Sequence, residues 1–206
     1  YKPEEFIMKK ITNECNKPYF GVELEIENFY KRDILKTINN CGFLYLKYDG
    51  SLDDGAEIVS HPATLSYHLN NNKNYWERTL KAIKGGKGTS HKSGNCGLHI
   101  HINREFLPED RWLQLEIFME FYEEIFLKLS RRREFGHFLR PKATNKDYDM
   151  DTEDIVEDIV EQIEDAYDEG HDGRYHMVNT INEHTVEIRI FRGTLKYSSF
   201  VASLLI

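Results

Sequence analysis

GLHIHIN, residues Gly97 to Asn103, alternates strictly between apolar and polar side chains. A period of two predicts a half-buried β-strand with one face in the core. The opposite face carries His99, His101 and Asn103, whose imidazole and amide groups can bind ligands or metals. Taken alone, the segment fits two surface histidines equally well, so its interpretation depends on the other predicted strands.

A second segment with the same alternation runs from Tyr19 to Phe29. Glu23, Glu25 and Glu27 occupy alternate positions, and apolar residues lie between them. Three carboxylates along one strand face repel one another, and no lysine is interleaved with them. We therefore expect a positive group to lie over this face.

The rest of the chain reads as a mixture of helices and strands. Helices are predicted over 31–40, 65–84, 108–129, 152–169 and 196–206, and strands over 43–48, 56–60, 174–179 and 185–191. Turn residues at 49–55 connect two of the strands, which can bring Asp49 and Glu57 close together. The glycine-rich segment 85–94 precedes a strand and lacks the spacing of a phosphate-binding loop, so we interpret it as a lid or linker.

The composition is that of a globular protein with one domain over residues 1–206. The chain has 40% hydrophobic and 30% charged residues, enough for a substantial core. No apolar run reaches the length of a bilayer span, so no membrane partner is expected. The three cysteines lack the spacing of a disulfide framework, which favours a cytoplasmic location. The first residue is not methionine, which is compatible with termini truncated from a longer protein.

The net charge of −8 is unevenly distributed along the chain. Twelve acidic residues and no basic one lie between Asp147 and Glu169, and without these twelve the net charge would be +4. A mildly basic body suits a small ligand that carries phosphate, whereas binding to DNA needs a broad basic surface. We therefore expect no nucleic-acid partner and interpret 152–169 as a helix with a solvated acidic face.

Four sets of residues on the predicted strands and the adjoining turn can bind metal ions or phosphate. Residues at i and i+2 of a strand point to the same side of it. In one sheet these faces would form a single surface of carboxylates, imidazole and arginine. Carboxylates with imidazole hold Mg²⁺ or Mn²⁺, and arginine binds phosphate. Zinc for a hydrolase would also fit, but that account leaves the arginines unused. The four sets are Glu23 with Glu25, Asp49 with Glu57, His99 with His101, and Glu187 with Arg189.

The order and spacing of these motifs resemble the putative amidoligase family, which belongs to the carboxylate–amine ligases with the glutamine synthetase fold. The similar segments are FGVELE (20–25), DGSL (49–52), EIVS (57–60), CGLHIH (96–101), and TVEIR (185–189) followed by GT (193–194). Segments around 130–132 and 174–179 resemble later motifs of the family, and the resemblance runs from about Phe20 to Leu195. It implies an α+β fold, with a curved, mainly antiparallel sheet and helices on one face.

The resemblance also implies an activity and roles for individual residues. The activity is ATP- and Mg²⁺- (or Mn²⁺-) dependent condensation of a carboxylate with an amine through an acyl phosphate. By motif position, one metal would be held by Glu25, Asp49 and Glu57, and the other by Glu23, His99 and Glu187. Glu187, Arg189 and Arg192 would be catalytic, and His101, Arg131, Arg132, Arg174 and Asn179 would bind the nucleotide. Asp49 departs from the Glu that glutamine synthetases use at this place, which shortens its reach by one methylene.

Three functions are compatible with the sequence. The first is a ligase acting on small-molecule or peptide carboxylates and amines. The second is a phosphotransferase on the same fold, and the third is a non-catalytic module that binds a nucleotide or partner. The retained carboxylates and arginines favour an enzyme. Cys96 precedes a strand without a feature that would lower its pKa, so we interpret it as a packing residue. The substrates and the oligomeric state are not defined by the sequence.

Overall fold

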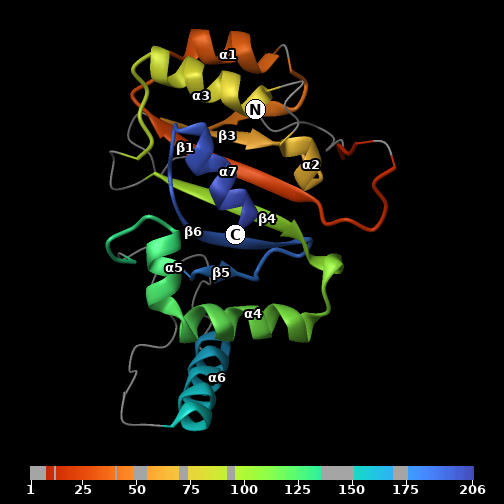
Figure 1. Ribbon diagram of the computed structural model, residues 1–206, viewed down its shortest axis with the longest axis vertical. Coiled ribbons are helices and arrows are strands. Elements are labelled where there is room, and N and C mark those ends of the chain that lie inside the picture. Colours follow the sequence, from red (N-terminus) through yellow and green to blue (C-terminus); the bar gives the residue numbers. More distant parts are fainter. Residues whose placement is uncertain are drawn as a thin grey trace. The chain divides into compact units, whose positions relative to one another are not determined.

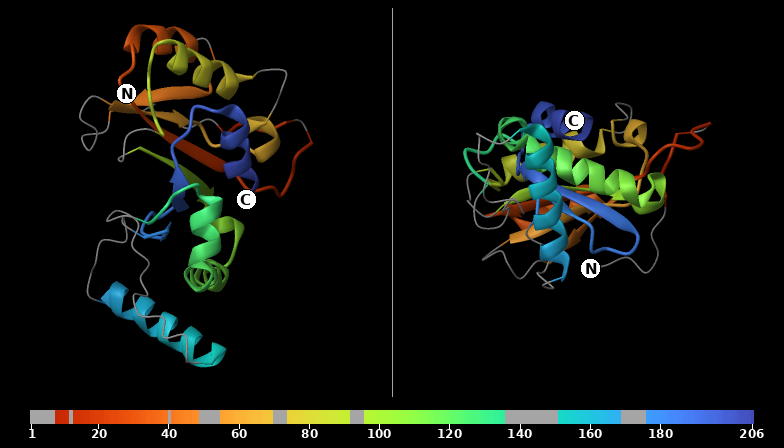
Figure 2. Two further views of the ribbon diagram at one scale, coloured as in Figure 1. Left: turned by 60° about the vertical axis from the view of Figure 1, so that its left-hand side comes forward. Right: turned by 90° about the horizontal axis from the view of Figure 1, so that it is seen from below.

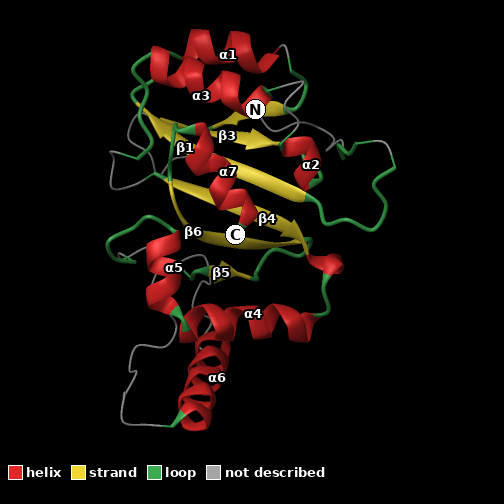
Figure 3. Cartoon of the chain, viewed as in Figure 1, coloured by secondary structure: helices red, strands yellow, loops and turns green. Residues whose placement is uncertain are grey.

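The computed structural model describes residues 8–11, 13–39, 41–48, 55–69, 74–91, 96–135, 151–168 and 176–206. Helices and antiparallel strand pairs make up these regions, which confirms the α+β class (Figures 1 and 3). The chain divides into two compact units, Tyr1–Asn103 with Phe191–Ile206, and Arg104–Ile190, and each is described by itself. The single domain over 1–206 and the glutamine synthetase-like fold stay predictions.

The first unit contains a four-stranded antiparallel sheet in the order β2-β3-β1-β4. The predicted strands in this unit are all present, with small differences at their ends. The elements are β1 (Phe20–Glu27), α1 (Lys31–Asn39), β2 (Leu44–Lys47), β3 (Gly55–Ser60), α2 (Leu65–His68), α3 (Tyr75–Gly85), β4 (Gly97–Asn103) and α7 (Tyr197–Leu205).

One face of this sheet forms the core of the unit. Five apolar side chains on this face are 0% exposed, namely Val22, Leu24, Ile26, Ile58 and Leu98. The three in β1 occupy every second position of the strand. The residues between them point to the opposite face, which is polar. The alternation predicted for β1 and β4 is therefore confirmed.

The helices of the first unit pack through aromatic side chains. Helices α1 and α3 lie side by side in Figure 1 and in the left-hand view of Figure 2, and α3 contacts α7 where the ring centroids of Trp76 and Phe200 are 4.5 Å apart. Trp76 Nε1 donates a hydrogen bond to His68 Nδ1 (3.1 Å), and His68 Nε2 lies 2.8 Å from Phe20 O. Because Nδ1 accepts, the proton is assigned to Nε2, and His68 connects α2 and α3 to β1.

Two predicted helices are each divided in the structure. The segment 65–84 forms α2 and α3, and Asn74 before α3 has a positive φ of 46°. Five residues between them, Asn70 to Asn74, include four asparagines, which favour turns over helix interiors. The segment 108–129 forms α4 (Glu109–Phe121) and α5 (Glu123–Leu129), separated at Tyr122 with φ −103° and ψ 32°.

The second unit contains a strand pair and helices. Its further elements are the 3₁₀ turn η1 (Arg104–Phe106), α6 (Thr152–Asp168), β5 (Val178–Asn179) and β6 (Thr185–Arg192), whose last two residues belong to the first unit. Strands β5 and β6 are antiparallel, with Asn179 directly opposite Glu187. Helix α6 packs on α4 through Ile159, which is 1% exposed and contacts Ile117 and Phe121. Across the described ranges, every helix is too short or too polar to cross a membrane.

Candidate functional site

The polar side of the first unit's sheet brings together most of the predicted metal ligands of this unit. Strand register places Glu25 directly opposite Glu57, and Glu23 directly opposite His99. Residues paired in this way have Cβ atoms about 4.5–5.5 Å apart. His101 lies two residues beyond His99 on the same side of β4. We refer to Glu23, Glu25, Glu57, His99 and His101 together as the carboxylate face.

These side chains are unusually well buried for charged and polar groups. Glu25, Glu57 and His99 are 7%, 5% and 8% exposed. Burial of a carboxylate is costly unless hydrogen bonds or positive charges compensate it. Glu25 receives one such bond, since its Oε2 accepts from the backbone N–H of Gly97. The burial of these side chains is not that of a solvated strand face.

Lys47 of β2 supplies the positive group expected over the glutamates. It is the register partner of Glu57, and its Nζ lies 2.7 Å from Glu57 Oε2 and 3.6 Å from Glu23 Oε1. Burial lowers the pKa of Lys47, but the charges of Glu23 and Glu57 raise it by more, so it lies above its ordinary value. Sequence reasoning missed this residue, although its place two positions after Tyr45 put both on one side of β2.

Tyr45 of β2 is the register partner of Val59 in β3. Val59 is in turn the register partner of Glu23 in β1. Burial, together with the charges of Glu23 and Glu57, raises the pKa of Tyr45 to about 12. The phenol is therefore neutral at physiological pH. Tyr45 was also missed from the sequence, where it looked like an ordinary strand residue.

Glu23 and His101 form a contact on this face. His101 Nε2 lies 3.7 Å from Glu23 Oε2, and both side chains are less than one fifth exposed. Burial raises the pKa of Glu23, but the contact with His101 and the charges of His101, Lys47 and His99 lower it by more. The net pKa of Glu23 is below its ordinary value, so it is ionised at neutral pH. The predicted role of His101 beside a nucleotide stays a prediction.

Gly97 leaves the space that two of these groups occupy. A Cβ at this position would lie 2.8 Å from His99 Nε2 and 3.3 Å from Glu25 Oε2. The first distance is shorter than real Cβ contacts allow, so the imidazole would have to move. The glycine at the start of β4 is therefore part of what positions His99 and Glu25.

In the second unit, Glu187 is held by two neighbours. Asn179 Nδ2 donates to Glu187 Oε2 (2.8 Å), and Arg189 Nε lies 3.7 Å from Glu187 Oε1. Asn179 and Glu187 are 4% and 5% exposed. Asn179 thus positions Glu187, and its predicted contact with a nucleotide stays a prediction. So does the joint metal site of Glu187 with Glu23 and His99, whose residues belong to different units.

The other predicted phosphate-binding residues have varied surroundings. Arg132 Nε donates to Ile190 O (2.8 Å), so part of this guanidinium supports β6. Arg131 has a positive φ of 63° at the turn after α5. Arg192 is exposed, and a side-chain N–H donates to His91 O. Two predicted residues, Asp49 and Arg174, lie outside the described residues.

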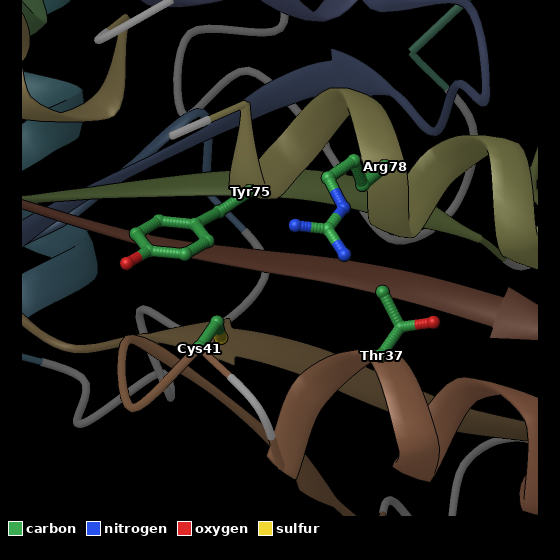
Figure 4. A pocket seen from close by; sticks show the side chains of 4 residues that line it. All are labelled: Thr37, Cys41, Tyr75 and Arg78. Carbon is green, nitrogen blue, oxygen red and sulfur yellow. The ribbon is translucent and has the colours of Figure 1, made fainter. Parts of the chain in front are cut away.

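A small hollow elsewhere in the first unit does not compete with the carboxylate face as a site. It is lined by Thr37, Cys41, Tyr75 and Arg78, from α1, α3 and the turn after α1 (Figure 4). Its volume of about 10 Å³ suffices for no more than one water molecule. Cys41 Sγ accepts hydrogen bonds from the backbone of Phe43 and Leu44, a structural role.

Comparison with known proteins identifies the family. Residues 44–204 match the family model described as putative amidoligase enzyme. The chain belongs to this family. The match confirms the resemblance inferred from the motifs and includes Glu57, His99 and Glu187 of this amidoligase-family protein. The matched region begins after β1. The candidate role of Glu23 and Glu25 as metal ligands therefore rests on the sequence motif and on their register with Glu57 and His99. None of the curated proteins compared with the chain matches it.

Proposed function

We propose that this protein is an ATP- and divalent-metal-dependent ligase that forms an amide from a carboxylate and an amine. The observation that carries the proposal is the register of β1 with its two neighbours, which pairs Glu25 with Glu57 and Glu23 with His99. Family membership supports the reaction class. The burial of these groups on one face supports a cation site within it.

The donor set fits Mg²⁺ or Mn²⁺. Buried carboxylate oxygens suit hard divalent cations, and an imidazole ligand favours Mn²⁺ or mixed occupancy. Bound there, the cations would neutralise the phosphates of ATP. In our proposal the first is held by Glu25, Asp49 and Glu57, and the second by Glu23, His99 and Glu187.

The proposed reaction proceeds in two steps. The substrate carboxylate attacks the γ-phosphorus of ATP, which gives an acyl phosphate and ADP. The amine then attacks the acyl carbon, phosphate leaves, and the nitrogen loses a proton. Arg189 and Arg192 are proposed to neutralise the transferred phosphoryl group, and Glu187 to orient Arg189, to which it lies close. The protein contributes positioning and charge neutralisation, so no protein nucleophile is required.

Product analysis tests the proposal. The protein is incubated with ATP and Mn²⁺ over mixtures of amino acids, peptides and polyamines, and products are followed by mass spectrometry. A condensed amide with ADP and free phosphate supports the ligase. A stable phosphorylated product without free phosphate would instead indicate a phosphotransferase, and ATP binding without consumption a non-catalytic module.

A matched pair of variants connects the chemistry to the carboxylate face. Glu57→Gln removes a proposed metal ligand, whereas Glu77→Gln removes a half-buried carboxylate outside that face, which pairs with Lys81 on α3. We expect only Glu57→Gln to abolish Mn²⁺-dependent binding of ATP. Equal ATP binding with Mn²⁺ and with chelator, or an unchanged Glu57→Gln variant, contradicts the proposed site.

A further inference from the structure

Lys47 already balances two carboxylates that the proposed function assigns to metal ions. Its Nζ contacts Glu57 Oε2 at 2.7 Å and lies 3.6 Å from Glu23 Oε1. By motif position, these two glutamates belong to the two different metal sites. The ammonium group therefore lies between two positions where divalent cations are proposed to bind.

We infer that Lys47 is an internal counter-cation of the carboxylate face, and that a divalent cation binding to Glu57 displaces it. This inference rests on the proposed function, because it concerns the same ligands. It adds a residue that neither the motifs nor the family match assigns. It predicts that metal binding is accompanied by movement of the Lys47 side chain from Glu57 towards solvent.

The exchange follows from charge and geometry. An ammonium 2.7 Å from Glu57 Oε2 and a cation about 2.0–2.6 Å from the same oxygen would be within a few ångströms of each other and repel. Glu57 is 5% exposed and needs a positive partner at all times, because an uncompensated buried carboxylate is strongly destabilising. Lys47 can be replaced as that partner, since its side chain is 44% exposed and its four-carbon stem is flexible.

The competition has two measurable effects of opposite sign. Removing the lysine charge leaves Glu23 and Glu57 repelling each other in chelator, which lowers the melting temperature. The same removal frees Glu57 for a metal ion, which tightens metal binding. A residue that merely supported the strand would reduce both stability and metal affinity.

The experiment compares Lys47→Met with Lys81→Met. Both changes remove an ammonium that contacts a glutamate, but Lys81 pairs with Glu77 on α3. Melting temperatures are measured in chelator, and Mn²⁺ affinity is measured by titration calorimetry without nucleotide. Compared with wild type, we expect Lys47→Met to have a melting temperature at least about 2 °C lower in chelator. We also expect it to bind Mn²⁺ about tenfold more tightly than wild type does. Lys81→Met is expected to leave Mn²⁺ affinity unchanged.

The outcomes separate this inference from the proposed function. Mn²⁺ binding by wild type that Lys47→Met weakens or leaves unchanged overturns the displacement of Lys47, while the metal site stands. Absence of Mn²⁺ binding by both proteins overturns the metal site and the inference together. If Lys47→Met does not fold, Lys47→Gln takes its place, because the amide keeps a hydrogen-bond donor without the charge.

Discussion

Acid should destabilise this protein through His68, the residue that connects α2 and α3 to β1. Its side chain is 4% exposed, and its two ring nitrogens are engaged by Trp76 and Phe20. Protonation at Nδ1 would remove the hydrogen bond from Trp76 and place a charge in the core. Burial accordingly lowers the pKa of His68 from 6.5 to about 4, although its bond to Phe20 acts in the opposite direction.

The size and sign of the effect follow from this shift. Between pH 6.5 and pH 4 the unfolded chain binds a proton at His68 that the folded protein does not bind. The contribution of neutral His68 to the free energy of unfolding is therefore complete above the pKa of this histidine in the unfolded chain, and it is lost as the pH falls through this window. At about 1.4 kcal/mol per pH unit, the loss amounts to roughly 3 kcal/mol of the free energy of unfolding.

Urea unfolding of wild type and His68→Gln, followed by tryptophan fluorescence, measures this contribution. A glutamine amide can donate to Phe20 O and accept from Trp76, but it does not titrate. The stability of wild type relative to the variant should fall by roughly 3 kcal/mol between pH 7 and pH 4. Other titrating groups cancel in this difference. Parallel loss of stability in both proteins would refute the reasoning, because the buried histidine would then contribute nothing to the pH dependence.

Three further predictions concern the site. His99→Ala should lower turnover per folded molecule by more than about 100-fold with little change in melting temperature. Leu98→Ala, at a 0% exposed position, should instead cost about 2–5 kcal/mol of stability and keep its specific activity. If His99→Ala unfolds the protein but the folded fraction remains active, the histidine is structural. Gly97→Ala should weaken Mn²⁺ binding about tenfold or more, because the new Cβ displaces His99 Nε2, and unchanged affinity in calorimetry would show that the ring is not a ligand. Asn179→Ala should destabilise the protein by about 1–3 kcal/mol in thermal unfolding, since it removes the hydrogen bond that Asn179 donates to the buried Glu187, and a neutral effect would argue against this positioning role.

The strands and the carboxylate face could be predicted from the sequence because both depend on local alternation. Glu23, Glu25, His99 and His101 lie on one side of their strands whatever the details of packing. The contact of Lys47 with Glu57 could not be predicted in this way. It depends on the register between β2 and β3. The alternation within each strand does not specify which residues of the two strands lie opposite each other.

The breaks within the helices were also invisible to periodicity. The apolar pattern continues through Phe118, Tyr122 and Phe126, although α4 ends just before Tyr122. An apolar position in this pattern does not ensure burial either, since Phe118 is 51% and Tyr122 42% exposed. Which side of an amphipathic helix is covered depends on neighbouring elements, and these are set by tertiary structure. The pairing of Asn179 with Glu187 likewise follows from the register of β5 with β6.

The alternation in β1 has a consequence for how this protein can change over evolution. Leu24 and Ile26 build the core, while Glu23 and Glu25 build the carboxylate face, so one segment encodes both in a frame of two residues. Point substitutions can alter ligands and core independently of each other. A single inserted or deleted residue within β1 would exchange the two faces over the rest of the strand, and would turn carboxylates into the apolar core and leucine and isoleucine onto the polar face. Tolerated length changes should therefore be confined to the connections between strands, and a scan of single-residue insertions should show β1, β3 and β4 as uniformly intolerant.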